Sequence, residues 1–163
     1  MYSIQLLSPE QWKIFKVIRL EALRNSPNSF GSTFEVEFFF TQNDWVNKLR
    51  NTKDLHLVAL LDNFKPIGLI ILKPYQEQVG IFAMYVNPTF RGRGIASDLI
   101  DAVIEYAIKK QFSEIILDVY DQNNSAIELY KRKGFIFTRV KSTLPSPRKH
   151  IIKHQMLLNL SYP

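Results

Sequence analysis

Residues 79–111 constrain the fold of this chain more than any other segment does. They begin with the apolar run VGIFAMYV, which predicts a buried strand, and pass through the turn NPTFRGR into a predicted helix at 94–111. The apolar residues of that helix recur every four positions, at Ile95, Leu99, Val103 and Ala107. A helix with one apolar stripe needs a surface to cover, so the strand at 79–86 is expected to belong to a sheet.

Other apolar runs supply the rest of the expected sheet. Strands are predicted at 2–7, 56–61, 66–73, 114–119, 135–140 and 150–160. Short polar loops separate the runs at 56–61, 66–73 and 79–86, which favours an antiparallel meander. The last two runs are expected to form a closing hairpin around a proline-rich loop.

Three further helices are predicted from capping residues and apolar spacing. The first spans residues 8–24 and begins with a capping box formed by Ser8 and Gln11. The others span 42–51 and 123–133. Helices and strands together define an α+β class. Because the sequence has no repeat and no long linker, one domain over residues 1–163 is expected.

Composition and charge narrow the function. The chain has no cysteine, which excludes a disulfide framework and thiolate metal sites, and a predicted strand carries the pair His150 and His154, so no metal is expected. No apolar run reaches the ~20 residues of a membrane span, and the first residues lack the charged-then-apolar order of a secretory signal, so a cytoplasmic protein with no membrane partner is expected. A net charge of +6 favours an anionic partner: a nucleotide cofactor, nucleic acid or an acidic surface.

The turn before the helix at 94–111 has the features of an anion site. Gly92 and Gly94 leave backbone amides accessible at a helix start, and Arg91 and Arg93 add positive charge. This combination suits a pyrophosphate. A solvated basic turn is the alternative interpretation. A dinucleotide-binding loop fits less well, because Ser97 stands where its third glycine belongs.

A second motif lies in the helix predicted at 123–133. Asn123, Ala126 and Tyr130 are three and four residues apart, so they share one face of that helix. One ligand can therefore touch all three. The alternative interpretation is that Tyr130 only packs on the sheet.

Together these motifs resemble those of the GCN5-related N-acetyltransferase (GNAT) family. The run at 86–96, VNPTFRGRGIA, is similar to the acetyl-coenzyme A (acetyl-CoA) motif of the family, and the run at 123–135 is similar to its second signature. In order and spacing the resemblance covers residues 57–160. Residues 19–30 are a softer match to the acceptor-side helices of small members.

This resemblance implies a fold, a division of the domain and an activity. The fold is a GNAT-like α+β arrangement, with a central, mostly antiparallel mixed sheet flanked by about four helices. Acceptor-side helices are expected at about 8–51, an acetyl-CoA-binding half at about 78–135 and a C-terminal hairpin at about 135–160. The implied activity is transfer of the acetyl group of acetyl-CoA to a primary amine of a small molecule or peptide, by direct attack in a ternary complex.

The resemblance also implies which residues bind acetyl-CoA, with no metal. Pyrophosphate is expected on the turn amides, and the pantetheine arm along the splayed edge of the strand at 79–86, where an amide also holds the thioester oxygen. Asn123 is expected to bond the pantetheine amides, and Ala126 to leave room for the arm. The expected cofactor-binding residues are Met84, Tyr85, Val86, Arg91, Gly92, Arg93, Gly94, Ile95, Ala96, Asn123 and Ala126.

Tyr130 is the expected catalytic acid, which protonates the departing CoA thiolate. The base is left open. Protein lysine acetyltransferases of the family carry a glutamate on the strand that contacts the thioester, but residues 81–86 contain no acid. The candidates, acting directly or through water, are Glu21, Glu35, Glu37 and Asp118.

The acceptor is defined less sharply. The segment FGSTFEVEFFF at 30–40 either fills the core or forms an apolar wall whose carboxylates, Glu35 and Glu37, attract a cationic amine. A homodimer is left open. The alternatives to an enzyme are a non-catalytic acetyl-CoA sensor and a basic nucleic-acid-binding module. Nucleic acid is not expected, because the aromatic and basic residues do not form a stacking platform.

Overall fold

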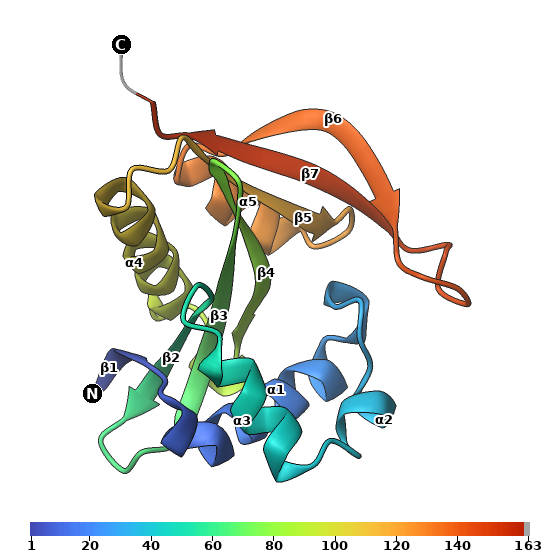
Figure 1. Cartoon of the computed structure of the whole chain (residues 1–163). Helices are drawn as coiled ribbons and strands as arrows, with labels where there is room; N and C mark the ends of the chain where they lie inside the picture. Colours follow the sequence, from blue (N-terminus) through green and yellow to red (C-terminus); the bar gives the residue numbers. More distant parts are fainter. Residues whose placement is uncertain (162–163) are drawn as a thin grey trace.

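The structure, a computed structural model, describes residues 1–161. Seven strands form one sheet in the order β1-β2-β3-β4-β5-β7-β6 (Figure 1). Within it, only the pair β4 and β5 is parallel, so the expected mostly antiparallel mixed sheet is confirmed. The strands are β1 (Tyr2–Leu6), β2 (Leu55–Leu61), β3 (Pro66–Tyr75), β4 (Gln78–Val86), β5 (Glu114–Tyr120), β6 (Ile136–Thr143) and β7 (Ile152–Asn159).

Helices cover both faces of this sheet, which confirms the α+β class. The first predicted helix is divided: a 3-10 turn at Pro9–Gln11 precedes α1, and the Gln11 side chain accepts from the Ser8 amide at 3.0 Å. A short helix at 34–37 was not predicted. The helices are α1 (Trp12–Asn25), α2 (Phe34–Glu37), α3 (Gln42–Arg50), α4 (Ile95–Lys109) and α5 (Asn124–Arg132).

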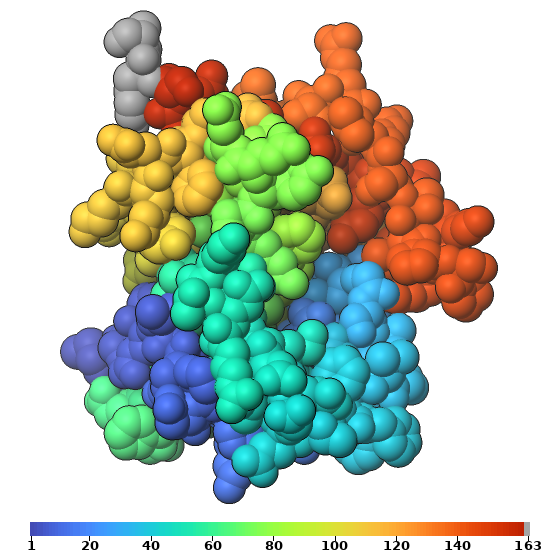
Figure 2. Space-filling model, in the orientation of Figure 1, coloured from blue at the N-terminus to red at the C-terminus, as the bar shows by residue number. Residues whose placement is uncertain are grey.

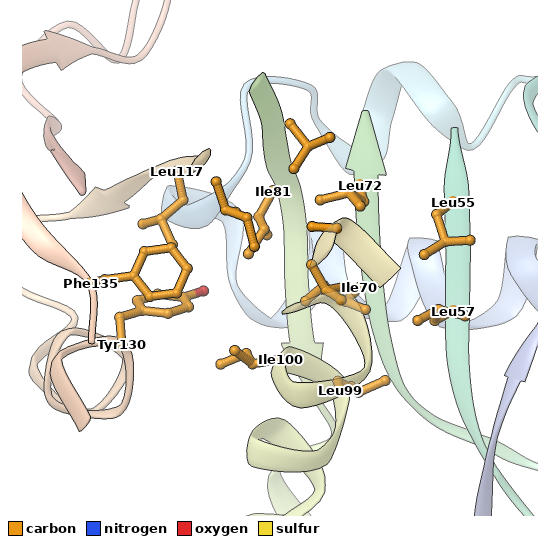
Figure 3. Packing of buried hydrophobic residues seen from close by; sticks show 14 of the residues in the cluster. Leu55, Leu57, Ile70, Leu72, Ile81, Leu99, Ile100, Leu117, Tyr130 and Phe135 are labelled. Carbon is orange, nitrogen blue, oxygen red and sulfur yellow. The ribbon is translucent and has the colours of Figure 1, made fainter. Parts of the chain in front are cut away.

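Two apolar clusters fill the two faces. On one face, α4 and α5 pack against β2–β5, and the predicted stripe of α4 is buried along its whole length. Figure 3 shows Leu99 of this stripe among the buried side chains of the sheet. On the other face, α1 and α3 pack through Phe15, Ile18 and Trp45. Burial of each large apolar side chain contributes about 1.5–3 kcal/mol to the stability of the fold. Packing against the sheet therefore stabilises both helix layers.

A β-bulge in β4 shapes the centre of the molecule. Ile71 pairs with Ala83 and Leu72 pairs with Ile81, so Phe82 is an extra residue without a partner on β3. Pairing of β4 with β5 ends at Ile81, although β4 continues to Val86. The two strands diverge from there (Figure 1), which leaves one edge of β4 unpaired over residues 82–86.

The remaining differences from the predicted elements lie near the C-terminus. β6 extends to Thr143 because its pairing with β7 resumes at Lys141 after an irregularity that begins at Phe137. The hairpin places β7, not β6, beside β5. No helix in residues 1–161 has both the length and the apolar character needed to cross a membrane.

Candidate active site

The divergence of β4 and β5 opens a cavity of about 480 Å³, called here the turn cavity. It is lined by the end of β4, the turn at residues 90–97 and one face of α5. Both predicted motifs therefore face one space. The sequence placed them on separate elements, and the sheet brings them together.

The backbone of the turn is arranged to bind an anion. Gly92 and Gly94 have φ values of 75° and 85°, which side chains with a Cβ rarely adopt. The amides of residues 92–97 donate no hydrogen bond within the described part of the chain, since the first helical bond runs from Asp98 to Gly94. Unpaired amides at the start of a 15-residue helix attract negative charge. This cradle fits the pyrophosphate of acetyl-CoA.

The two arginines of the turn have different surroundings. The Nε atom of Arg91 donates to the Val86 carbonyl at 2.9 Å, which directs its guanidinium along the wall of the turn cavity. Arg93 does not line that cavity, and its guanidinium lies 5.3 Å from the centre of the Phe90 ring. A different cation, Arg132 of α5, lines it. Geometry thus favours Arg91 and Arg132 over Arg93 as phosphate ligands.

The α5 face carries all three predicted residues into the cavity. The Asn123 side chain caps the helix by accepting from the Ala126 amide at 3.3 Å, so its NH₂ group stays available to a ligand. Ser125, Leu129 and Arg132 line the same cavity and were missed by the sequence reasoning. Their spacing of four and three residues continues the predicted face and could have identified them.

The end of β4 contributes backbone and side chains to the same wall. Met84, Tyr85 and Val86 all line the turn cavity. The Tyr85 hydroxyl accepts from the Asn25 side chain at 2.9 Å. Burial, together with the nearby Glu21 carboxylate, raises the pKa of Tyr85 to about 12, so its hydroxyl stays protonated at neutral pH.

Tyr130 lies where the turn cavity meets a second one. Its ring packs edge-on against Phe135 with centroids 5.6 Å apart, and its hydroxyl is directed toward β4 (Figure 3). Within residues 1–161 that hydroxyl makes no hydrogen bond, and burial raises its pKa well above the usual range of a phenol. The Tyr130 ring can therefore pack on the sheet while its hydroxyl remains available to a ligand.

The second cavity, of about 340 Å³, is called the hairpin cavity because β6, β7 and their connection form one of its walls. The bulge of β4 and the exposed end of β5 form the opposite side, and Ser29 and Gly31 close it from the α1–α2 connection. The two cavities share the residues Ser29, Met84, Asn123, Ala126 and Tyr130. A ligand in one can therefore reach a ligand in the other at Tyr130.

The four candidate bases have four different environments. The Glu37 carboxylate is buried in a two-point ion pair with Arg19 at 2.9 and 3.0 Å; burial opposes ionisation, but the Arg19 hydrogen bonds hold the pKa of Glu37 below its usual value. Glu21 accepts from Asn87 at 3.1 Å, and Glu35 is exposed on α2. Asp118 is the member of the four that lines a cavity, the hairpin cavity.

No phenylalanine of the segment at 30–40 lines either cavity, although Gly31 of this segment lines the hairpin cavity. Phe30, Phe34 and Phe40 pack with the cluster under α1 and α3, whereas Phe38 and Phe39 are exposed. The core-filling interpretation therefore describes three of the five rings. No apolar wall of phenylalanines borders the site, and neither Glu35 nor Glu37 faces it.

Comparison with known families assigns the chain. Residues 18–135 match the model of the acetyltransferase (GNAT) family. The chain belongs to this family, which confirms the expected membership and the acetyltransferase class. In the part that the structure describes, no cluster of three or more potential metal ligands occurs.

Relatives share parts of the sequence. An N-acetyltransferase of Methanocaldococcus jannaschii is 40% identical over 80 residues, which is 45% of this chain and 35% of that protein. A thialysine N-epsilon-acetyltransferase of Sus scrofa is 45% identical over 51 residues, covering 31% of this chain and 30% of the relative. A peptidyl-lysine N-acetyltransferase of Salmonella typhimurium is 30% identical over 106 residues, covering 65% and 63%. The chain thus spans less than two thirds of the length of each relative.

Solved structures share the whole fold at low identity. A PaiA N-acetyltransferase of Thermoplasma acidophilum in complex with coenzyme A has a TM-score of 0.75 at 19% identity, over 98% of this chain and 99% of that one. An acetyltransferase of Acinetobacter baylyi has a TM-score of 0.83 at 15% identity, over 100% and 95%. These similarities confirm the expected GNAT fold.

Proposed function

We propose that this protein transfers the acetyl group of acetyl-CoA to a primary amine of a small molecule or peptide, by direct attack in a ternary complex. The observation that carries the proposal is the pair of cavities that share Tyr130, one with an anion cradle and one without. Two substrates can then meet without an acyl-enzyme. The names of two relatives, which act on thialysine and on peptidyl-lysine, support an amine acceptor.

The turn cavity is proposed to hold acetyl-CoA, which supplies a thioester whose acetyl carbon accepts the amine. The amides of residues 92–97 and the Arg91 guanidinium bind the pyrophosphate, with Arg132 as an added cation and Arg93 outside the contact. The unpaired edge of β4 at Met84–Val86 hydrogen-bonds the pantetheine arm and the thioester oxygen. The Asn123 side chain bonds the arm from the other side, and the small Ala126 leaves space for it.

Tyr130 is proposed to donate its proton to the departing thiolate. Burial favours the neutral phenol, so the proton is present throughout the neutral range. The same shift makes full transfer to a thiolate of pKa near 8.5 uphill, so a strong hydrogen bond to sulfur is the main contribution. Within residues 1–161 the hydroxyl has no protein acceptor that would compete for this bond.

Asp118 is the proposed proton acceptor for the amine. It follows the last β4–β5 pair, Ile81 with Leu117, and faces the hairpin cavity next to the bulged Phe82. A carboxylate there binds an ammonium and removes its proton through water before attack. Glu37 is buried in its ion pair with Arg19 and lines neither cavity, so it is not positioned for this role.

The test is release of free coenzyme A from acetyl-CoA in the presence of primary amines. At about 100 times its Kd, acetyl-CoA should stabilise the protein by about 2.7 kcal/mol, which identifies correctly folded, binding-competent protein before the assay. Asp118→Asn should then lower turnover with little change in acetyl-CoA binding. Binding without thiol release for any amine would indicate a non-catalytic sensor instead.

A further inference from the structure

Among residues 1–161, Lys153 of the hairpin cavity has no carboxylate in ion-pair contact. It lies half-buried on β7, opposite Tyr120 on one side and Ser142 on the other. No carboxylate of residues 1–161 lies within 4.0 Å of its ammonium. A desolvated ammonium costs free energy unless a negative group pairs with it. The acceptor is the group that can supply this charge.

Gln155 presents a second donor beside Lys153. The two residues are two apart on one strand, so their side chains share a face of the sheet, and both line the hairpin cavity. The Gln155 Oε1 atom accepts from the Thr138 hydroxyl at 2.8 Å, so the NH₂ group points away from Thr138. Within the described residues this NH₂ group has no acceptor. A carboxylate with two oxygens matches an ammonium and an amide NH₂ side by side.

Two charged neighbours act on Lys153 from a longer distance, the anionic Asp118 and, more weakly, the cationic Arg148. Burial lowers the pKa of Lys153; Asp118 opposes this shift, and Arg148 adds to it. Glu128 is the last acidic side chain of the sequence. Eight lysines and arginines follow it: Lys131, Arg132, Lys133, Arg139, Lys141, Arg148, Lys149 and Lys153. Of these eight side chains, only Lys153 lines the hairpin cavity, so it is the cation that the described residues place there.

Asp118 fixes where the amine lies relative to this cation. In the β5–β7 register, Asp118 is opposite Gln155 and Tyr120 is opposite Lys153. Asp118 and Lys153 are thus diagonal neighbours across two strands, a separation of roughly 7 Å between backbone positions. An amine held at Asp118 and an anion held at Lys153 belong to one compact molecule or residue.

We propose that the acceptor carries a carboxylate close to its amino group, and that Lys153 and Gln155 bind this carboxylate while Asp118 receives the amine. This inference rests on the proposed function and names its acceptor class. It also refines the expected cationic acceptor, because the amine is accompanied by a negative group. The volume of the hairpin cavity, about 340 Å³, lies at the small end of ligand sites and suits an amino acid.

The experiment measures thiol release with matched pairs of amines that differ only in the carboxylate. The pairs are alanine and alaninamide, lysine and lysinamide, and the peptide amides Asp-Ala-NH₂ and Asn-Ala-NH₂. The first pairs test a free amino acid, and the last tests a peptide residue. In at least one pair the acid should have a kcat/KM about 10- to 100-fold above its neutral partner, the effect of one charged hydrogen bond.

Three variants assign the preference to Lys153. Lys153→Met keeps the length of the side chain and should reduce the acid preference to within about twofold, through KM and not through acetyl-CoA binding. Lys153→Arg should retain it. Lys149→Met removes the same charge from an exposed position of the same hairpin and should change nothing. Equal use of both members of every pair by the wild type, or a preference that survives Lys153→Met, would overturn the inference.

Binding to the protein saturated with coenzyme A separates this inference from the proposed function. Calorimetry with the same pairs should show the acid binding about tenfold or more tightly than its partner, and Lys153→Met should abolish the difference. Such binding without any thiol release would support the carboxylate site and refute the transferase. Turnover of the neutral amines alone, with no preferential binding of acids, would support the transferase and refute the carboxylate site.

Discussion

The turn cavity and the hairpin cavity are built from different materials. The first owes its polar character mainly to backbone amides at 92–97, held open by two glycines with positive φ, and to one face of α5. The second owes its character to side chains from segments near residues 30, 82, 118, 143 and 154, which lie far apart in the sequence. A backbone site depends on a short motif, whereas a side-chain site depends on how the whole sheet is assembled.

This difference explains what each cavity can recognise. Backbone donors at a helix start bind phosphate whatever the neighbouring side chains are, so one cofactor suits many sequences. Side chains such as Asp118, Lys153 and Gln155 can be exchanged without disturbing the strands that carry them. Acceptor choice is therefore expected to change by substitutions in the hairpin cavity and cofactor choice by changes to the turn backbone.

The largest effect, and the strongest test of this difference between the cavities, is expected from Arg91→Ala combined with Gly94→Val. The first change removes a charged hydrogen bond, and the second forces a β-branched residue into a φ of 85° beside the phosphate path. The Kd for acetyl-CoA, measured by calorimetry, should rise about 1,000-fold. Arg93→Ala is the matched control and should stay within about twofold. A double variant that binds normally would mean that the turn is only structural.

A smaller effect is expected from Tyr130→Phe, which keeps the ring on Phe135 and deletes the hydroxyl shared by the two cavities. With the acid removed, kcat should fall about 10- to 1,000-fold, while the Kd for acetyl-CoA stays the same. Rapid-mixing kinetics that isolate the chemical step provide the measurement. An unchanged rate of that step would return Tyr130 to a packing role.

The sequence predicted the turn cavity better than the hairpin cavity for the same physical reason. Periodicity located the strands and the α4 stripe, and the short motifs placed Gly92, Gly94, Asn123 and Tyr130 at one site. The bulge at Phe82 was missed, because an extra residue in one strand is visible only against the register of its partner.

Contacts between residues or strands far apart in the chain could also not be predicted from the sequence. The burial of Glu37 depends on Arg19, and the position of β7 beside β5 depends on the whole sheet, so Lys153 and Gln155 could not be placed at the site. Asp118 remained one of four candidates until the geometry distinguished them. Arg132 was the exception, since its helical spacing was readable and was overlooked.

Acid should destabilise the packing on the face of the sheet that carries the α1–α2 connection. His56 is buried against Phe15, and burial, with Lys73, Lys48 and Arg19 nearby, lowers its pKa to about 4 from 6.5. Above pH 6.5 the ring is neutral in both the folded and the unfolded state. As the pH falls toward 4, the unfolded state binds a proton that the folded state does not, so the free energy of unfolding falls by about 3 kcal/mol.

Urea unfolding at several pH values between 7 and 4 measures this loss. His56→Phe, which cannot titrate, should flatten the dependence of the unfolding free energy on pH, whereas His150→Gln at an exposed position should not. If both variants followed the wild-type curve, other groups would account for the acid sensitivity.

The smallest expected effect concerns Arg148, which joins two walls of the hairpin cavity. Its guanidinium donates to the carbonyls of Pro27, Phe30 and Gly31 at 2.7, 3.0 and 2.8 Å. These bonds hold the α1–α2 connection, in blue, against the β6–β7 connection, in orange (Figure 2). Among the described residues, the Arg148 side chain donates no hydrogen bond to the turn at 92–97.

Arg148→Met should therefore loosen the acceptor wall and leave the anion-binding turn at 92–97 intact. The KM for a good amine should rise about 3- to 10-fold, and the Kd for acetyl-CoA should stay within about twofold, since the lost bonds are worth about 1 kcal/mol each and water replaces part of them. Steady-state kinetics with both substrates varied gives the two constants, and Lys149→Met controls for the lost charge. Equal changes in the KM for the amine and the Kd for acetyl-CoA would show that a change in one cavity alters the other. That result would contradict the view that the two cavities are built independently.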